Sequence, residues 1–175
     1  EMIENGQLPY ILRTDNKPIP ECRNILVENA LKTQATHFLM IDDDVIMPVG
    51  GLKKMIEANT DIAFIDYPMH FEGDRWGNMG TATYDEWLPG DDTKGKPIKW
   101  AGLGCCLVKR EVFEKMKKPW FVKLDQSFIR DSNGKMILDK TDLELGGGGE
   151  DVYFFIEAQK LGFKVKQVEG ACGHA

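Results

Sequence analysis

Residues 37–41 (HFLMI) form a short apolar run that stops at three consecutive aspartates, Asp42, Asp43 and Asp44. A nearly continuous apolar run of this length is typical of a strand buried on both faces of a parallel sheet. Charged side chains at its end cannot be buried without partners. The pattern therefore predicts an interior strand whose carboxyl end, where open α/β sheets bind their ligands, carries a cluster of negative charge.

The rest of the chain alternates between helical and strand patterns. Helical spacing predicts helices at residues 21–34, from Pro48 onward, at 110–117 and at 150–161. Apolar runs predict further strands at 62–65, 98–108 and 163–168, with a short extended segment at 8–12. The order strand, helix, strand over residues 37–65 is that of a βαβ unit, so we expect an α/β fold with a mostly parallel central sheet flanked by helices.

The segments without clear periodicity predict loops and turns. Residues 69–96, rich in Gly, Asp, Thr and Trp, indicate a small excursion of antiparallel strands and loops. Residues 132–134 (SNG) predict a hairpin turn. Four glycines at 146–149 precede the last helix, and Gly162 is expected to end it.

Length and charge exclude several classes of protein. The chain has 175 residues, the size of one domain, and we interpret residues 1–175 as a single unit. Its formal net charge of -6 provides no overall basic field, so we expect no general nucleic-acid binding. Because we find no apolar stretch long enough for a transmembrane segment, and the four cysteines lack paired CxxC spacing, we expect a cytoplasmic protein with reduced thiols.

The aspartate cluster has two interpretations. In an extended chain, the side chains of Asp42 and Asp44 point to the same side and can grip one divalent cation, which prefers hard oxygen ligands. The alternative is a solvated acidic turn before the next helix, since aspartates are common in turns. The residues alone leave both interpretations open.

Five segments carry a resemblance that covers nearly the whole chain. They are Arg23 and Asn24 at a helix start, IDDDV at 41–45, GLGCCLVKREVFEKM at 102–116, GGGGEDVYFFIEAQKLGF at 146–163 and CGHA at 172–175. In this order they resemble the glycosyltransferases of the GT-A fold, similar to family 2. The resemblance implies a Rossmann-like GT-A domain that moves a sugar from a nucleoside diphosphate sugar, UDP- or GDP-linked, to the hydroxyl of an acceptor such as a glycan or a lipid-linked sugar.

The resemblance also implies a donor site. Arg23, Asp42, Asp43 and Asp44 would lie at the diphosphate, with Asp42 and Asp44 binding Mn²⁺ or Mg²⁺ and His174 completing the metal site. The residue types suit this chemistry, because a metal ion stabilises a departing diphosphate and a neutral imidazole is a reasonable ligand for Mn²⁺. Arg23 either approaches the diphosphate or holds the aspartates by a salt bridge, and the sequence does not separate these roles.

By the same resemblance, Asp151 contacts the acceptor and acts as the catalytic base, with Glu150 beside it, which implies inversion at the sugar. A base for the incoming hydroxyl is what glycosyl transfer requires. The alternative is that both acids only stabilise the first turn of a helix. Gly149 and the glycines before it favour close approach of a substrate, although a linker has the same composition.

Trp100, Gly102 and Gly104 are further candidates for acceptor binding, together with Gly149. An indole beside small residues suits packing against a sugar, but a bulged strand with a core tryptophan explains the same pattern and is slightly favoured. The adjacent Cys105 and Cys106 are expected to be small buried residues.

One feature departs from the family pattern. Members usually begin with an apolar strand that holds the nucleotide base, and we find none before residue 8. We therefore expect either a chain that lacks its amino-terminal piece or a different mode of nucleotide binding.

A nucleotidyltransferase would need a phosphate loop rich in Gly and Lys, which we do not find, so the main alternative is a catalytically silent nucleotide-sugar-binding or interaction module of the same fold.

Overall fold

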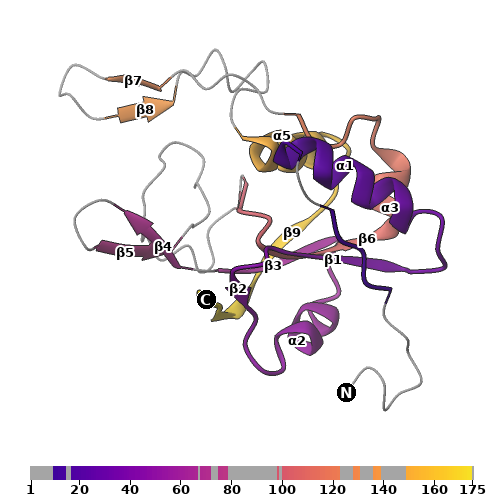
Figure 1. The fold of residues 1–175 in the computed structure, drawn as a ribbon, viewed down its shortest axis with the longest axis horizontal. Coiled ribbons are helices and arrows are strands. Elements are labelled where there is room, and N and C mark those ends of the chain that lie inside the picture. Colours follow the sequence, from indigo (N-terminus) through magenta and orange to yellow (C-terminus); the bar gives the residue numbers. More distant parts are fainter. Residues whose placement is uncertain are drawn as a thin grey trace.

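A central sheet separates two layers of helices in the computed structural model, which describes residues 10–14, 17–66, 68–71, 75–78, 98, 100–122, 128–130, 136–138 and 149–174 (Figure 1). Helices α1 (Ile19–Ala30), α3 (Arg110–Lys115) and α5 (Glu150–Lys160) cover one face of the sheet. Helix α2 (Gly51–Glu57) covers the other face. The protein thus has a mixed α/β fold with helices on both faces of the sheet, as its sequence predicts.

The sheet has the strand order β1–β6–β3–β9. Its strands are β1 (His37–Ile41), β6 (Cys105–Lys109), β3 (Ile62–Asp66) and β9 (Val165–Ala171). Strand β6 is antiparallel to both β1 and β3, whereas β9 is parallel to β3, so β1, β3 and β9 run in the same direction. The expected parallel sheet is therefore confirmed only in part, because β6 inserts between the two strands of the predicted βαβ unit and reverses the pairing there.

Strand β1 is less buried than its apolar sequence predicts. Phe38 is buried, but His37 and Ile41 at the two ends are exposed. The physical reason is position, because β1 is the outer strand of the described sheet and is covered less completely than an interior strand. All five residues of the interior strand β3 are buried.

Short strands form three further pairs outside this sheet. They are β2 (Val45–Ile46) with β10 (Gly173–His174), β4 (Pro68–Phe71) with β5 (Arg75–Asn78), and β7 (Phe128–Arg130) with β8 (Met136–Leu138). The antiparallel pairing of β7 with β8 confirms the two strands predicted on either side of residues 132–134. That turn itself, most of residues 69–96 and the glycines at 146–148 lie outside the described residues.

The predicted helices are present with shifted ends. Helix α1 ends at Ala30, earlier than predicted, and α2 begins at Gly51 instead of Pro48. Gly50, the residue before α2, has a φ of 77°, and Gly162, after α5, has a φ of 86°. Glycine adopts this left-handed conformation without the steric cost that a side chain brings, which explains why both helix ends carry it.

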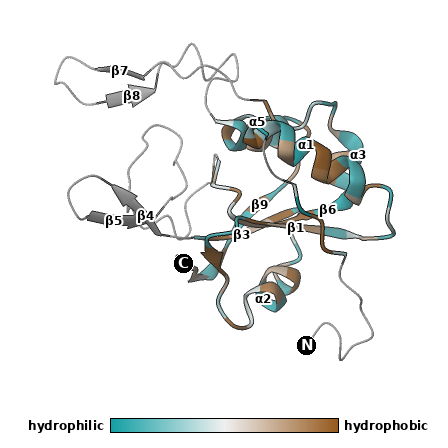
Figure 2. Cartoon of the chain, in the orientation of Figure 1, coloured by the Kyte–Doolittle hydropathy of each residue, from teal (hydrophilic) through white to brown (hydrophobic). Residues whose placement is uncertain are grey.

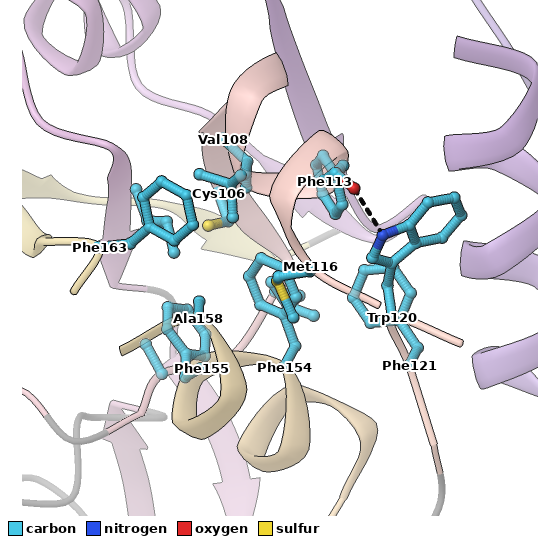
Figure 3. Packing of buried hydrophobic residues seen from close by; sticks show 14 of the residues in the cluster. Cys106, Val108, Phe113, Met116, Trp120, Phe121, Phe154, Phe155, Ala158 and Phe163 are labelled. Atoms are coloured by element: carbon cyan, nitrogen blue, oxygen red, sulfur yellow. Dashed lines mark hydrogen bonds between the residues drawn. The ribbon is translucent and has the colours of Figure 1, made fainter. Parts of the chain in front are cut away.

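Aromatic rings fill the core between the sheet and helices α1, α3 and α5 (Figure 3). The ring of Phe113 lies 5.4 Å from that of Phe38, 5.5 Å from that of Phe154 and 6.0 Å from that of Trp120. The indole nitrogen of Trp120 donates a hydrogen bond of 2.9 Å to the carbonyl oxygen of Phe113. Each of these helices carries both hydrophilic and hydrophobic residues, as amphipathic helices do (Figure 2). This cluster fixes α5, the helix that carries the predicted base, against the sheet.

A second, smaller core lies on the α2 side and includes Cys105 and Cys172. All four cysteines of the chain are free, and Cys105 and Cys106 are fully buried, as predicted. Burial raises the pKa of the Cys105 thiol to about 12, so this group stays protonated at neutral pH.

Asn24 joins helix α1 to the segment that carries Trp120 and Phe121. Its Nδ2 donates to the carbonyl oxygens of Pro20 and Phe121, both at 2.8 Å. Its Oδ1 accepts from the amides of Trp120 at 3.0 Å and Phe121 at 3.3 Å. One side chain thus satisfies backbone groups on two separate segments.

We expect the substitution Asn24→Ala to lower the free energy of unfolding by about 2–4 kcal/mol, because it leaves several backbone groups without partners. Urea denaturation measures this loss. Asn29→Ala on the same helix is the control, since Asn29 accepts only an exposed hydrogen bond from Lys32 among the contacts resolved for its side chain. We expect that change to stay within about 0.5 kcal/mol, and equal losses in the two variants would contradict the role given to Asn24.

Candidate active site at the carboxyl edge of the sheet

The carboxyl end of β1 leads into an acidic turn. The amide of Asp42 donates to the carbonyl oxygen of Gly104 at 3.0 Å, and the amide of Val45 donates back to the carbonyl oxygen of Asp42 at 3.1 Å. Asp43 and Asp44 lie in the turn that this second bond closes, and both are exposed. The extended conformation expected for Asp42 to Asp44 is therefore wrong, and strand alternation does not decide which way these carboxylates point.

Arg23 links this turn to the start of α5. Its Nη2 lies 3.0 Å from Asp42 Oδ1, and its Nη1 lies 2.9 Å from Glu150 Oε1. The Arg23 side chain is only 12% exposed, so both ion pairs are partly shielded from water. Of the two roles that the sequence left open, this geometry corresponds to holding the acids by salt bridges. The guanidinium brings together α1, the end of β1 and the first turn of α5.

Asp151 lies in the first turn of α5, next to Glu150. Its Oδ1 accepts a hydrogen bond of 2.8 Å from the amide of Val152. Burial and, to a smaller degree, the charge of Glu150 raise the pKa of Asp151 to about 6, against the opposing effects of the Val152 amide and Arg23. A carboxylate with a pKa near 6 is suited to accept a proton close to neutral pH.

Gly149 has a steric role beside this carboxylate. A Cβ atom at position 149 would lie 2.6 Å from Asp151 Oδ1, closer than a carbon and an oxygen can approach without moving. The absence of a side chain at Gly149 therefore lets the Asp151 carboxylate fold back onto the helix end. Acceptor binding by Gly149 stays a prediction.

The end of the chain returns to the acidic turn. Strand β10 pairs with β2 in antiparallel register, with His174 opposite Val45 and Gly173 opposite Ile46 (Figure 1). Cα atoms of such partners lie about 5 Å apart, and Val45 directly follows Asp44. The backbone of His174 thus lies beside the aspartates although the two segments are far apart in the sequence.

The metal site itself stays a prediction. The position of the His174 imidazole lies outside the described side chains. Among the side chains that are described, no group of three His, Cys, Asp or Glu residues lies close enough together to hold a metal ion. The pairing of β10 with β2 does fit the predicted donor set, because it brings the backbone of His174 next to Asp44.

The acceptor-side candidates lie in the interior. Trp100 is 6% exposed and belongs to the aromatic core, which corresponds to the core interpretation of this tryptophan. Gly102 and Gly104 are buried as well. Gly104 contributes its carbonyl oxygen to the amide of Asp42, so it helps to position the acidic turn.

Sequence reasoning missed Asp66, the last residue of β3. Asp66 is 5% exposed and is the one buried charged residue of the described chain. Its Oδ2 accepts a hydrogen bond of 2.7 Å from Gln167 Nε2, whereas its Oδ1 has no hydrogen-bond partner among the described residues. Burial raises the pKa of Asp66 to about 6, and the bond from Gln167 acts in the opposite direction. The signal was present, because the apolar run IAFI at 62–65 ends in an aspartate just as HFLMI does.

Comparison with known proteins supports the fold class. No protein-family model and no curated protein matches the chain. Among solved structures, it is similar to the crystal structure of A197 from STIV, with a TM-score of 0.55 and 16% sequence identity over 96% of this chain and 72% of that one. At this identity the likeness shows a shared fold and nothing about activity.

The fold and the site together define a mixed α/β protein whose sheet carries acidic residues at one edge. These acids come from the end of β1, the end of β3 and the start of α5. No helix in the described part of the chain has the length and apolar character that crossing a bilayer requires.

Proposed function

We propose that the protein is a metal-dependent glycosyltransferase of the GT-A type, which moves a sugar from a UDP- or GDP-sugar to an acceptor hydroxyl with inversion. The observation that carries this proposal is the meeting of four separate segments at one edge of the sheet. Asp42 and Glu150 share the guanidinium of Arg23, Asp151 lies beside Glu150, and the backbone of His174 pairs next to Asp44.

The donor would bind at the acidic turn. Asp42, Asp44 and His174 would hold Mn²⁺ or Mg²⁺, which when bound supplies positive charge to the diphosphate leaving group. Asp44 lies on the surface of the turn, in contact with solvent. Arg23 keeps Asp42 in place through their ion pair, so the turn is oriented before the donor arrives.

Asp151 would accept the proton of the acceptor hydroxyl. Its raised pKa, near 6, leaves it ionised at neutral pH while keeping it basic enough to take a proton. Glu150 is engaged by Arg23 at 2.9 Å, which lowers its availability as an alternative base. In this proposal Glu150 therefore supports Asp151 through its charge and through the link to Asp42.

Calorimetry with UDP and GDP, each with and without Mn²⁺, tests the donor site. We expect binding that needs the metal, and we expect Asp44→Ala to weaken it by more than about tenfold, equal to about 1.4 kcal/mol. Glu57→Ala is the matched control, because Glu57 is an exposed acid at the end of α2. Nucleotide binding of equal strength with and without Mn²⁺, and unchanged in Asp44→Ala, would count heavily against the proposal.

A catalytically silent binding module of the same fold is the second candidate. One observation favours it, since the hydrogen bond from the Val152 amide is also what an acid in the first turn of a helix makes for purely structural reasons. Hydrolysis of a nucleotide sugar by the intact protein, abolished in Asp151→Asn, excludes this candidate.

A further inference from the structure

The side chain of Asp66 has an unused hydrogen-bond acceptor in a buried position. Asp66 is 5% exposed, and its Oδ1 has no hydrogen-bond partner among the described residues. Buried polar atoms in folded proteins nearly always have a partner, and an ionised carboxylate without one is especially unfavourable. Such an atom therefore needs an explanation, and a ligand group that completes the hydrogen bonding is one.

Among the described residues, no contact that holds the fold together uses this oxygen. The main-chain carbonyl of Asp66, not its side chain, accepts the amide of Cys172 at 2.8 Å and so joins β3 to the end of β9. The other side-chain oxygen, Oδ2, already receives the hydrogen bond from Gln167. Neither contact depends on Oδ1 or on a negative charge at this position.

Asp66 ends β3 and Asp42 directly follows β1, and these two strands run in the same direction. The amide of Asp42 bonds to the carbonyl oxygen of Gly104. On the other side of β6, the antiparallel pairs end with Phe64 opposite Cys106, and extending this register by two residues would put Asp66 level with Gly104. Since neighbouring strands are about 4.8 Å apart, this register would separate the backbones of the two aspartates by roughly 10 Å. Gly104 lies between them and places no side chain there.

The two aspartates also belong to the same face. In β3, Ile62 and Phe64 pack into the core under α1, α3 and α5, whereas Ala63 and Ile65 pack on the α2 side. Strand alternation therefore directs Asp66 to the face of α1 and α5. Asp42 is on this face because it contacts Arg23 of α1.

We propose that Asp66 is a donor-binding residue whose free Oδ1 accepts a hydrogen bond from a hydroxyl of the sugar ring. This inference rests on the proposed function, since it requires a nucleotide sugar at the edge where Asp42 and Asp151 lie. A diphosphate at the acidic turn would have its sugar within reach of Asp66 across Gly104. A carboxylate oxygen is a strong acceptor for a hydroxyl, and the buried setting strengthens this bond.

Asp66→Asn is the test, because asparagine keeps the shape and can still accept the hydrogen bond from Gln167 with its oxygen. Its amide nitrogen would then replace the free Oδ1, so the sugar hydroxyl loses its charged acceptor and can at best accept a weaker, neutral hydrogen bond from the amide. The matched control is Asp61→Asn near the opposite end of β3. Asp61 accepts from the amide of Lys164 at 2.9 Å and lies 3.5 Å from Lys109 Nζ, with no part in the acidic edge.

The measurement is the ratio of dissociation constants for a nucleoside diphosphate and its sugar, using UDP with UDP-glucose and GDP with GDP-mannose, all with Mn²⁺. We expect Asp66→Asn to weaken binding of the nucleotide sugar by about tenfold or more relative to the diphosphate, the size of a lost hydrogen bond to a charged group. Asp61→Asn should leave the ratio as in the wild type. An unchanged ratio in Asp66→Asn overturns the inference and leaves the proposed function standing. Absence of any nucleotide binding by the wild-type protein overturns both.

Thermal unfolding distinguishes this role from a structural one. The pKa of Asp66 in the folded protein is about 6, above its ordinary value of 3.8, so the folded state binds the proton more tightly than the unfolded state. The stabilisation that comes from this tighter proton binding is complete below about pH 4 and is lost as the pH rises toward 6. At pH 7 the buried charge opposes folding, so Asp66→Asn should melt no lower than the wild type, whereas a clearly lower melting temperature would assign Asp66 a structural role. Should Asp66→Asn fail to fold, Asp66→Ser takes its place in the binding measurement.

Discussion

Asp151→Asn is expected to lower the rate of sugar transfer, or of donor hydrolysis in the absence of acceptor, by about 10²–10⁴-fold. Asparagine can still accept the hydrogen bond from the Val152 amide, so the first turn of α5 should keep its structure. What it loses is the ability to take a proton. We therefore expect the affinity for the nucleotide, measured by calorimetry, to change little while the rate falls.

The pH dependence of the rate gives an independent readout of Asp151. A base works only when deprotonated, and the pKa of Asp151 is about 6, so the wild-type rate should rise with pH through a midpoint near 6 and level off above it. Two neighbouring charges affect this pKa, and that of Glu150, which raises it, has a larger effect than that of Arg23. We therefore expect Glu150→Gln to move the midpoint of the rate profile to lower pH. Full activity in Asp151→Asn would exclude Asp151 as the base.

A matched control separates catalysis from a general change in helix α5. Glu157 is on the same helix and pairs with Lys160 at 2.6 Å on its outer side. Glu157→Gln removes one carboxylate from α5, as Asp151→Asn does, but far from the acidic edge. We expect its rate and its pH profile to match those of the wild type.

Phe113→Ala is expected to lower the free energy of unfolding by about 3–5 kcal/mol. Phe113 is 1% exposed and stacks on Phe38 and Phe154 while meeting the edge of Trp120 (Figure 3). Its removal opens a cavity between elements that are distant in the sequence, which the surrounding rings cannot fill without leaving their own contacts. A domain of ordinary stability, about 5–15 kcal/mol, would lose a large part of its margin.

Urea denaturation measures this effect, and Phe113→Leu provides the graded control. Leucine refills much of the space, so we expect a smaller loss, under about 2 kcal/mol. If Phe113→Ala cost less than about 1 kcal/mol, the aromatic cluster would not be the main support of α1, α3 and α5. Because Phe154 is on α5, we also expect Phe113→Ala to loosen the helix that carries Asp151.

Local patterns in the sequence were sufficient to predict most helices and strands. The apolar run at 37–41 is a strand, and the periodic segment from Glu150 is a helix that stops before Gly162. These features depend on neighbouring residues only, through side-chain alternation, helical spacing and the left-handed preference of glycine. The order in which the strands pair could not be predicted in the same way, because β6 comes from a segment far along the chain and inserts between β1 and β3.

In the candidate site, too, the sequence predicts local features but not the contacts between distant segments. The acids at 42–44, 150 and 151 stand out in the sequence, and the chain returns near them at His174 through the pairing of β10 with β2. The bridge from Arg23 to both Asp42 and Glu150 could not be read from spacing, since it joins residues brought together only by the packing of α1 and α5. The turn at Asp43 and Asp44 also departs from the extended chain that the alternation argument assumed.

The sequence by itself determined which residue types can carry chemistry and which segments are helix or strand, because both follow from side-chain chemistry and short-range periodicity. Only the tertiary structure decided that Arg23 links two acids, that Trp100 is a core residue, and that Asp66 is buried with one oxygen unpartnered among the described residues. The physical reason is that burial and hydrogen-bond satisfaction depend on contacts between distant segments, which no local pattern specifies.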